Sequence, residues 1–92
     1  MGIEVRIPTI LRSYTGGAKT VDGSGATLDE LLNNLETAHG GLRERLVDGE
    51  KLRRFVNVYL NDEDVRFLAG LETPVKDGDT VTVLPAVAGG SR

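Results

Sequence analysis

The chain opens with apolar and charged residues in strict alternation. Ile3, Val5 and Ile7 are separated by single charged residues, and this period of two is typical of a strand with one buried face. A proline at position 8 ends the pattern. After a glycine pair, residues 19–21 predict a short returning strand. The first quarter of the chain therefore predicts a β-hairpin with a long loop.

A stripe of leucines predicts one long helix. Four leucines fall at the spacing i, i+3, i+4 and i+7, which places them on one helix face: Leu28, Leu31, Leu32 and Leu35. Thr27 and Glu30 form a capping box, in which Thr27 accepts a backbone N–H and Glu30 reaches back to the cap. The Gly40-Gly41 pair predicts the end of this helix, and residues 42–47 predict one further short helical turn.

The second half of the chain predicts three more strands. The segments are a strand at residues 54–60, a turn at 61–64, a brief partner strand at 65–67 and a final strand at 80–84 that Pro85 ends. The first of these is the most strand-prone stretch of the sequence. Its residues Val56, Val58 and Leu60 share one face.

These elements predict an α+β domain. The leucine helix is the only long amphipathic element, so it must cover the apolar face of the strands. If the first and last strands are neighbours they run parallel, which makes the sheet mixed. We expect the four leucines to be buried against residues of the sheet: Val5, Ile7, Val56, Val58, Val81 and Val83. We expect residues 1–85 to form this domain and residues 86–92 to form a flexible tail.

Composition narrows the classes of function. Ninety-two residues suffice for one domain, and a net charge of −3 with 11 basic residues provides no basic stripe for nucleic acid. The chain has no cysteine, which removes disulfides and thiolate chemistry. Neither a signal peptide nor an apolar run near the ~20 residues of a membrane span is present. We therefore expect a cytoplasmic protein with neither a membrane nor a nucleic acid as partner.

The sequence offers few groups for catalysis. His39 is the only histidine, and its place beside the end of the predicted helix favours a structural role. The acidic residues 62–64 lack the ligand spacing of a calcium loop. The serines have no base in their sequence context. We therefore expect no enzyme activity, no bound cofactor and no metal site.

The C-terminal segment is the remaining candidate. After Pro85 come Ala86, Val87, Ala88, Gly89 and Gly90, a run of small uncharged residues suited to entering a narrow channel. Glycine lets backbone approach a reactive centre closely, and a chain ending at Gly90 presents a carboxylate that can be activated. From the tail alone, a disordered glycine-rich end remains an equal alternative.

The whole chain resembles the ubiquitin-like sulfur carriers of the β-grasp fold, the family of MoaD, ThiS and CysO. The resemblance begins in residues 5–12 and continues through the helix at 27–35. It is sharpest in "RFVNVYLNDEDVRF", residues 54–67, and in "VKDGDTVTVLPAVAGG", residues 75–90. Within the family, the sequence is most similar to the carrier type that serves cysteine synthesis in actinobacteria.

The resemblance implies a mechanism centred on Gly90. In this family an E1-like enzyme uses ATP to adenylate the terminal glycine carboxylate, and sulfur then displaces AMP to leave a thiocarboxylate. The thiocarboxylate donates sulfur to a biosynthetic enzyme, here for cysteine or another sulfur-containing metabolite. The resemblance assigns the carboxylate to Gly90 and the channel-threading role to Gly89, Ala88 and Val87. The carrier is thus a protein co-substrate, and ATP belongs to the activating partner.

Two residues depart from the family pattern. Ser91 and Arg92 follow the diglycine, whereas such carriers function with glycine last. Either a JAMM-type metalloprotease removes them or they are a vector-derived addition. Two other functions stay open, an isopeptide-forming protein modifier and the small subunit of a molybdopterin-synthase-type complex. Phe67 and Leu84 are the candidates for the surface that binds partner enzymes.

Overall fold

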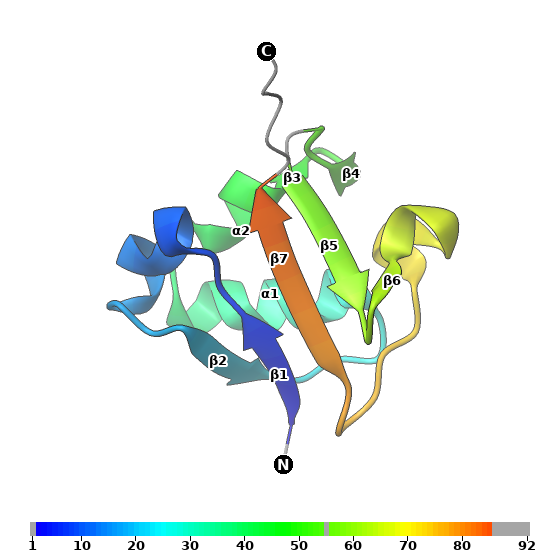
Figure 1. Ribbon diagram of the computed structural model, residues 1–92, viewed down its shortest axis with the longest axis horizontal. Coiled ribbons are helices and arrows are strands. Elements are labelled where there is room, and N and C mark those ends of the chain that lie inside the picture. Colours follow the sequence, from blue (N-terminus) through cyan, green and yellow to red (C-terminus); the bar gives the residue numbers. More distant parts are fainter. Residues whose placement is uncertain (1, 55, 86–92) are drawn as a thin grey trace.

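The computed structural model describes residues 2–54 and 56–85 (Figure 1). The N-terminal half contains β1 (Ile3–Arg6), the 3-10 helix η1 (Thr9–Thr15), β2 (Thr20–Gly23), α1 (Leu28–Ala38), α2 (Leu42–Leu46) and β3 (Val47–Asp48). The C-terminal half contains β4 (Lys51–Leu52), β5 (Val56–Leu60), β6 (Glu63–Asp64), the 3-10 helices η2 (Val65–Phe67) and η3 (Gly70–Glu72), and β7 (Thr80–Pro85).

The main sheet has five strands in the order β2-β1-β7-β5-β6. The central strand β7 runs parallel to its neighbour β1, with Val5 opposite Val81. The other pairs are antiparallel, so the sheet is mixed, as the sequence predicts. The helix α1 crosses one face of this sheet (Figure 1). This arrangement is the expected α+β, β-grasp architecture.

The core lies between α1 and the sheet. All four leucines of the helix stripe are at most 2% exposed, and the six sheet residues expected to cover them are buried as well. The helix lies close to the sheet at Gly23, where an added Cβ would stand 2.7 Å from Leu31 Cδ1. The predicted core is confirmed.

Both ends of α1 differ slightly from the prediction. Thr27 Oγ1 accepts from the Glu30 N–H at 3.2 Å, as expected for a cap. Glu30 Oε1, however, accepts from the Ala26 N–H at 2.9 Å, one residue before the cap. The helix ends at Ala38, and Gly41, at φ 94°, begins α2 instead of ending α1. The predicted extra turn corresponds to α2.

The prediction of a strand at residues 65–67 is wrong. Asn61 and Asp62, both with positive φ, make a turn so tight that pairing resumes at once, with Leu60 opposite Glu63. The partner strand is therefore Glu63–Asp64. Asp64 Oδ1 then accepts from the Arg66 N–H at 2.9 Å. This bond caps η2 and turns the chain away from the sheet.

Four further elements were absent from the sequence prediction. The helix η1 fills the long loop of the first hairpin, where it buries Leu11 and Thr15. The strands β3 and β4 form a second, two-stranded sheet around Gly49, whose φ is 70°. The fourth is the helix η3. All four are short, and none has an extended apolar pattern.

Candidate functional site

The candidate site lies at the carboxyl end of β7, the central strand from which the diglycine segment follows in the sequence. Pro85, the last residue of β7, pairs with Val56 at the start of β5. The sequence-predicted residues Val87, Ala88, Gly89, Gly90, Ser91 and Arg92 lie outside the described residues. The structure describes the chain up to Pro85, the residue that precedes this segment.

Phe67 and Leu84, the predicted partner surface, are both outside the core. Phe67 is 87% exposed and Leu84 is 44% exposed. Leu84 stands opposite Asn57 in the sheet, and Asn57 Oδ1 accepts from Arg66 Nη1 at 2.7 Å. A continuous series of contacts thus leads from Leu84 to η2, the element that carries Phe67. Exposed apolar side chains of this kind suit a docking surface, and their role in docking stays a prediction.

Arg66 also holds the start of β5, the strand that pairs with the end of β7. Its Nη2 donates to the carbonyl oxygens of Arg53, at 2.8 Å, and Val56, at 2.5 Å. Val56 is the register partner of Pro85. The guanidinium of Arg66 therefore connects η2 to the start of β5, and this part of β5 lies beside the end of β7.

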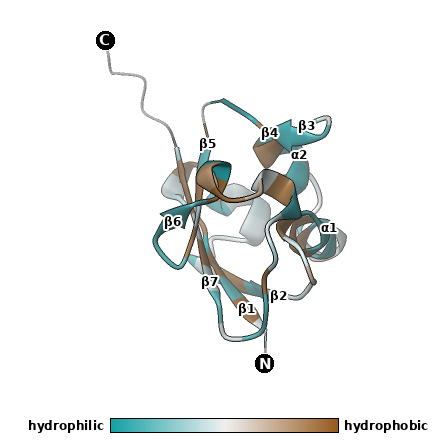
Figure 2. Cartoon of the chain, turned by 90° about the vertical axis from the view of Figure 1, so that its right-hand side faces the viewer, coloured by the Kyte–Doolittle hydropathy of each residue, from teal (hydrophilic) through white to brown (hydrophobic). Residues whose placement is uncertain are grey.

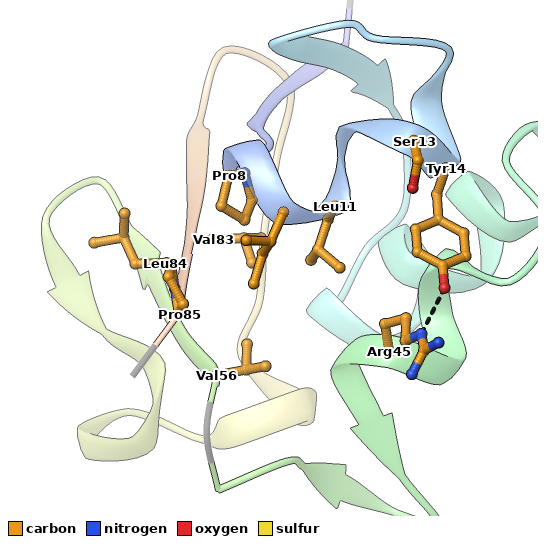
Figure 3. A pocket seen from close by; sticks show the side chains of 10 residues that line it. Pro8, Leu11, Ser13, Tyr14, Arg45, Val56, Val83, Leu84 and Pro85 are labelled. Carbon is orange, nitrogen blue, oxygen red and sulfur yellow. Dashed lines mark hydrogen bonds between the residues drawn. The ribbon is translucent and has the colours of Figure 1, made fainter. Parts of the chain in front are cut away.

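A groove of about 310 Å³ lies beside the end of β7 (Figure 3). It is lined by Pro8, Ile10, Leu11, Ser13, Tyr14, Arg45, Val56, Val83, Leu84 and Pro85. Val83 is buried beneath it, whereas Leu84 points away from Leu11 and Tyr14 (Figure 3). Ile10 is 69% exposed. Sequence reasoning missed this groove, because its walls come from η1, α2 and the strands β5 and β7.

Arg45 and Tyr14 form the polar side of the groove. Arg45 Nε donates to the Tyr14 hydroxyl oxygen at 2.6 Å, and the guanidinium carbon lies 5.6 Å from the ring centroid, within cation–π range. The hydrogen bond to Tyr14 raises the pKa of Arg45 above its ordinary value. The groove therefore combines apolar walls with the permanent positive charge of Arg45 (Figure 3).

The other arginines near α2 serve the fold. Arg43 Nη2 pairs with Asp29 Oδ1 at 2.5 Å, and Arg53 Nε donates to the Glu44 carbonyl oxygen at 2.8 Å. His39 caps the end of α1 through its backbone N–H. Within residues 2–54 and 56–85, no three carboxylate or imidazole side chains gather as metal ligands, and no helix is long and apolar enough to cross a membrane.

Comparison with known proteins identifies the family. The model of the ThiS family matches residues 5–90, which is nearly the whole chain and includes the diglycine. The chain belongs to the ThiS family. It is a sulfur carrier protein of the CysO type and therefore not an enzyme.

Individual relatives agree with this membership. The sulfur carrier protein CysO of Mycobacterium tuberculosis is 57% identical over 93 residues, covering 98% of this chain and all of the relative. Small archaeal modifier protein 3 of Haloferax volcanii is 42% identical with the same coverage. A crystal structure of the Amycolatopsis orientalis BexX/CysO complex contains a chain 61% identical to this one, with a TM-score of 0.91 over 96% of this chain and 99% of the other.

Proposed function

We propose that the carboxylate of Gly90 is the group on which this ThiS-family carrier transports sulfur. The observation that carries the proposal is the family match, which ends on Gly90. A carboxylate oxygen attacks the α-phosphorus of ATP within an E1-like enzyme and releases pyrophosphate. A sulfur nucleophile then attacks the acyl carbon, AMP leaves, and a glycyl thiocarboxylate remains. The carrier itself binds no cofactor, because ATP is held by its partner.

The adenylate is necessary because a free carboxylate is a poor electrophile. The thiocarboxylate that follows is ionised at neutral pH and is a good sulfur nucleophile. Since it is covalently attached to the carrier, it does not diffuse away before it meets the enzyme that accepts the sulfur. Cysteine or another sulfur-containing metabolite is the destination we propose, in the cytoplasm. The relative found in complex with BexX supports a second enzyme as partner.

Ser91 and Arg92 must be removed before activation. Reacting atoms need to approach to about 3–3.5 Å, and two further residues extend the chain by up to about 3.3–3.6 Å each, so they carry its end past the α-phosphate. Arginine also brings a permanent charge and a long side chain into a channel shaped for glycine. We propose a JAMM-type metalloprotease as the processing enzyme.

Three purified chains test this function. They end at Arg92, Gly90 and Gly89, and each is incubated with an E1-like enzyme, ATP and a sulfur source before its intact mass is measured. We expect the thiocarboxylate only on the chain that ends at Gly90. Equal modification of the Arg92 chain without cleavage would show that processing is unnecessary. Equal modification of the Gly89 chain would remove Gly90 from the mechanism.

A second function shares the same activated intermediate. The 42%-identical relative of Haloferax volcanii is named a small archaeal modifier protein, which favours a role in protein modification as the alternative. In that case a lysine amine of a target attacks the adenylated Gly90 carbonyl and forms an isopeptide bond. Covalent conjugates larger than the carrier then accumulate in cells, whereas a dedicated sulfur carrier yields none.

A further inference from the structure

The groove beside β7 has more exposed apolar surface than the fold requires. Ile10 lines it and is 69% exposed, although neighbouring Leu11 is only 8% exposed. Two prolines, Pro8 and Pro85, stand at its sides. Concave apolar surface with a few oriented polar groups is characteristic of binding sites. The groove is therefore suited to receive a side chain from another molecule.

Arg45 is held ready to bind an anion at this groove. Its Nε donates to Tyr14 and its guanidinium lies over the ring, which restricts its rotamers and reduces the entropy lost on binding. Among the described residues, no carboxylate lies within salt-bridge distance of Arg45. Its terminal nitrogens Nη1 and Nη2 are thus available to form the two-pronged pair that arginine makes with a carboxylate.

The short distance along the chain from Pro85 to Gly90 places the sulfur-transfer partner close to the groove. Gly90 is five residues beyond Pro85, so it lies at most about 18 Å from the groove even when the chain is fully extended. An enzyme that holds Gly90 in its active site therefore lies next to the groove. The chain carries a net charge of −3, whereas Arg45 is, among the residues that the structure describes, the one charged residue that lines the groove. A partner with a carboxylate at this point is complementary to it.

We propose that the groove binds an apolar side chain of the enzyme that accepts the tail, and that Arg45 pairs with a carboxylate beside that side chain. The proposal rests on the proposed function, because it takes the sulfur-accepting enzyme as the occupant. In this proposal, Ile10 and Arg45 are the residues that determine which enzyme binds at the groove. Tyr14 is a positioning residue, since it acts through Arg45.

Binding to BexX of Amycolatopsis orientalis tests the proposal, because this protein was crystallised with a relative 61% identical to the present chain. Dissociation constants are measured by calorimetry for the 92-residue chain and for the chain ending at Gly90, with and without Arg45→Gln or Arg45→Glu. We expect about two- to fivefold weaker binding for the neutral variant, the range of an exposed ion pair. For the reversed charge we expect at least about tenfold weaker binding, since repulsion is added.

Matched variants separate docking from folding. Lys76→Glu makes the same charge change at an 84% exposed side chain in the loop before β7, at the other end of that strand, and it should leave binding within about twofold. Ile10→Ser should weaken binding without changing its salt dependence, whereas Arg45→Gln should reduce that dependence, since salt screens the lost pair. Tyr14→Phe should give an intermediate loss. Thermal unfolding of every variant confirms that it is folded.

The outcomes distinguish a failure of the groove proposal from a failure of the proposed function. If wild-type chains bind and Arg45→Glu binds as tightly as Lys76→Glu, the groove is not the docking site and the proposed function is unaffected. If neither wild-type chain binds BexX, the proposed type of partner is wrong and the groove proposal falls with it. Weaker binding confined to the Ile10, Tyr14 and Arg45 variants supports the groove.

Discussion

The substitution Gly23→Ala tests how tightly α1 packs on the sheet. Gly23 is buried at the end of β2, and a Cβ there would lie 2.7 Å from Leu31 Cδ1 and 2.8 Å from Leu35 Cδ2. Overpacking of this kind costs about 1–3 kcal/mol. Gly23 does not have a positive φ, so the expected loss comes from the contacts with the helix. Gly40→Ala is the matched control, because a Cβ at Gly40 meets no atom within 4 Å.

Urea unfolding followed by far-UV circular dichroism measures the effect. We expect Gly23→Ala to lower the free energy of unfolding by about 1–3 kcal/mol, which corresponds to roughly 4–8 °C of melting temperature per kcal/mol in a domain of this size. Gly40→Ala should be neutral or stabilising by up to about 1 kcal/mol, because alanine restricts the unfolded chain. Equal stability of the two variants would refute the packing described here.

A double-mutant cycle identifies the atoms responsible. Leu31→Ala alone should cost about 2–5 kcal/mol, and it also removes Cδ1, the atom closest to the new methyl group. The loss in the double mutant should therefore be smaller than the sum of the single losses, by about 0.5 kcal/mol or more. If the losses of unfolding free energy in the two single mutants simply add, Gly23→Ala does not act through its contact with Leu31. An unchanged unfolding midpoint in Leu31→Ala would mean that the helix assignment is wrong.

Three further predictions concern the helix cap, acid stability and the partner surface. Thr27→Ala should cost about 0.5–2 kcal/mol in urea unfolding, because the Glu30 N–H loses its acceptor. The hydrogen bond from Asn61 and then the Lys76 N–H hold the pKa of Asp79 below its ordinary value. This stabilisation is present above the unfolded-state pKa of about 3.9 and is lost as pH falls through the folded value. Unfolding measured against pH should show this loss for wild type and not for Asp79→Asn. Finally, Phe67→Ala and Leu84→Ala should slow adenylation while both variants remain folded, and normal rates in both would exclude this patch.

The elements with a regular apolar pattern were predicted correctly from the sequence. Three alternating residues suffice for β1 and four leucines suffice for α1, because burial of one face dominates the energy of such elements. The parallel pairing of β1 and β7 follows once both are placed side by side. Residues 65–67 were wrongly predicted as a strand, because a three-residue apolar-polar-apolar run fits a strand and a 3-10 turn equally well. The capping residue Asp64 is the feature of the sequence that favours the 3-10 helix over the strand.

The candidate site was predictable only in part. Phe67 and Leu84 were predicted because each neighbours the side of the predicted sheet from which the tail follows. Both are exposed in the structure, and their role in docking stays a prediction. The groove was missed because Ile10, Arg45 and Pro85 are far apart in the sequence and meet only after folding. The bond between Tyr14 and Arg45 spans 31 positions. Neither residue carries a local pattern that indicates its partner.

The intact mass of the carrier in its native cell tests the central claim most directly. The carrier is isolated under conditions that preserve thioacids, and the mass of the chain ending at Gly90 is determined with and without a sulfur source. We predict a species heavier than this chain by the mass difference between sulfur and oxygen, which disappears when the activating enzyme is deleted. A chain found only with a free Gly90 carboxylate, or only as larger covalent conjugates with other proteins, would contradict the proposed role as a sulfur carrier.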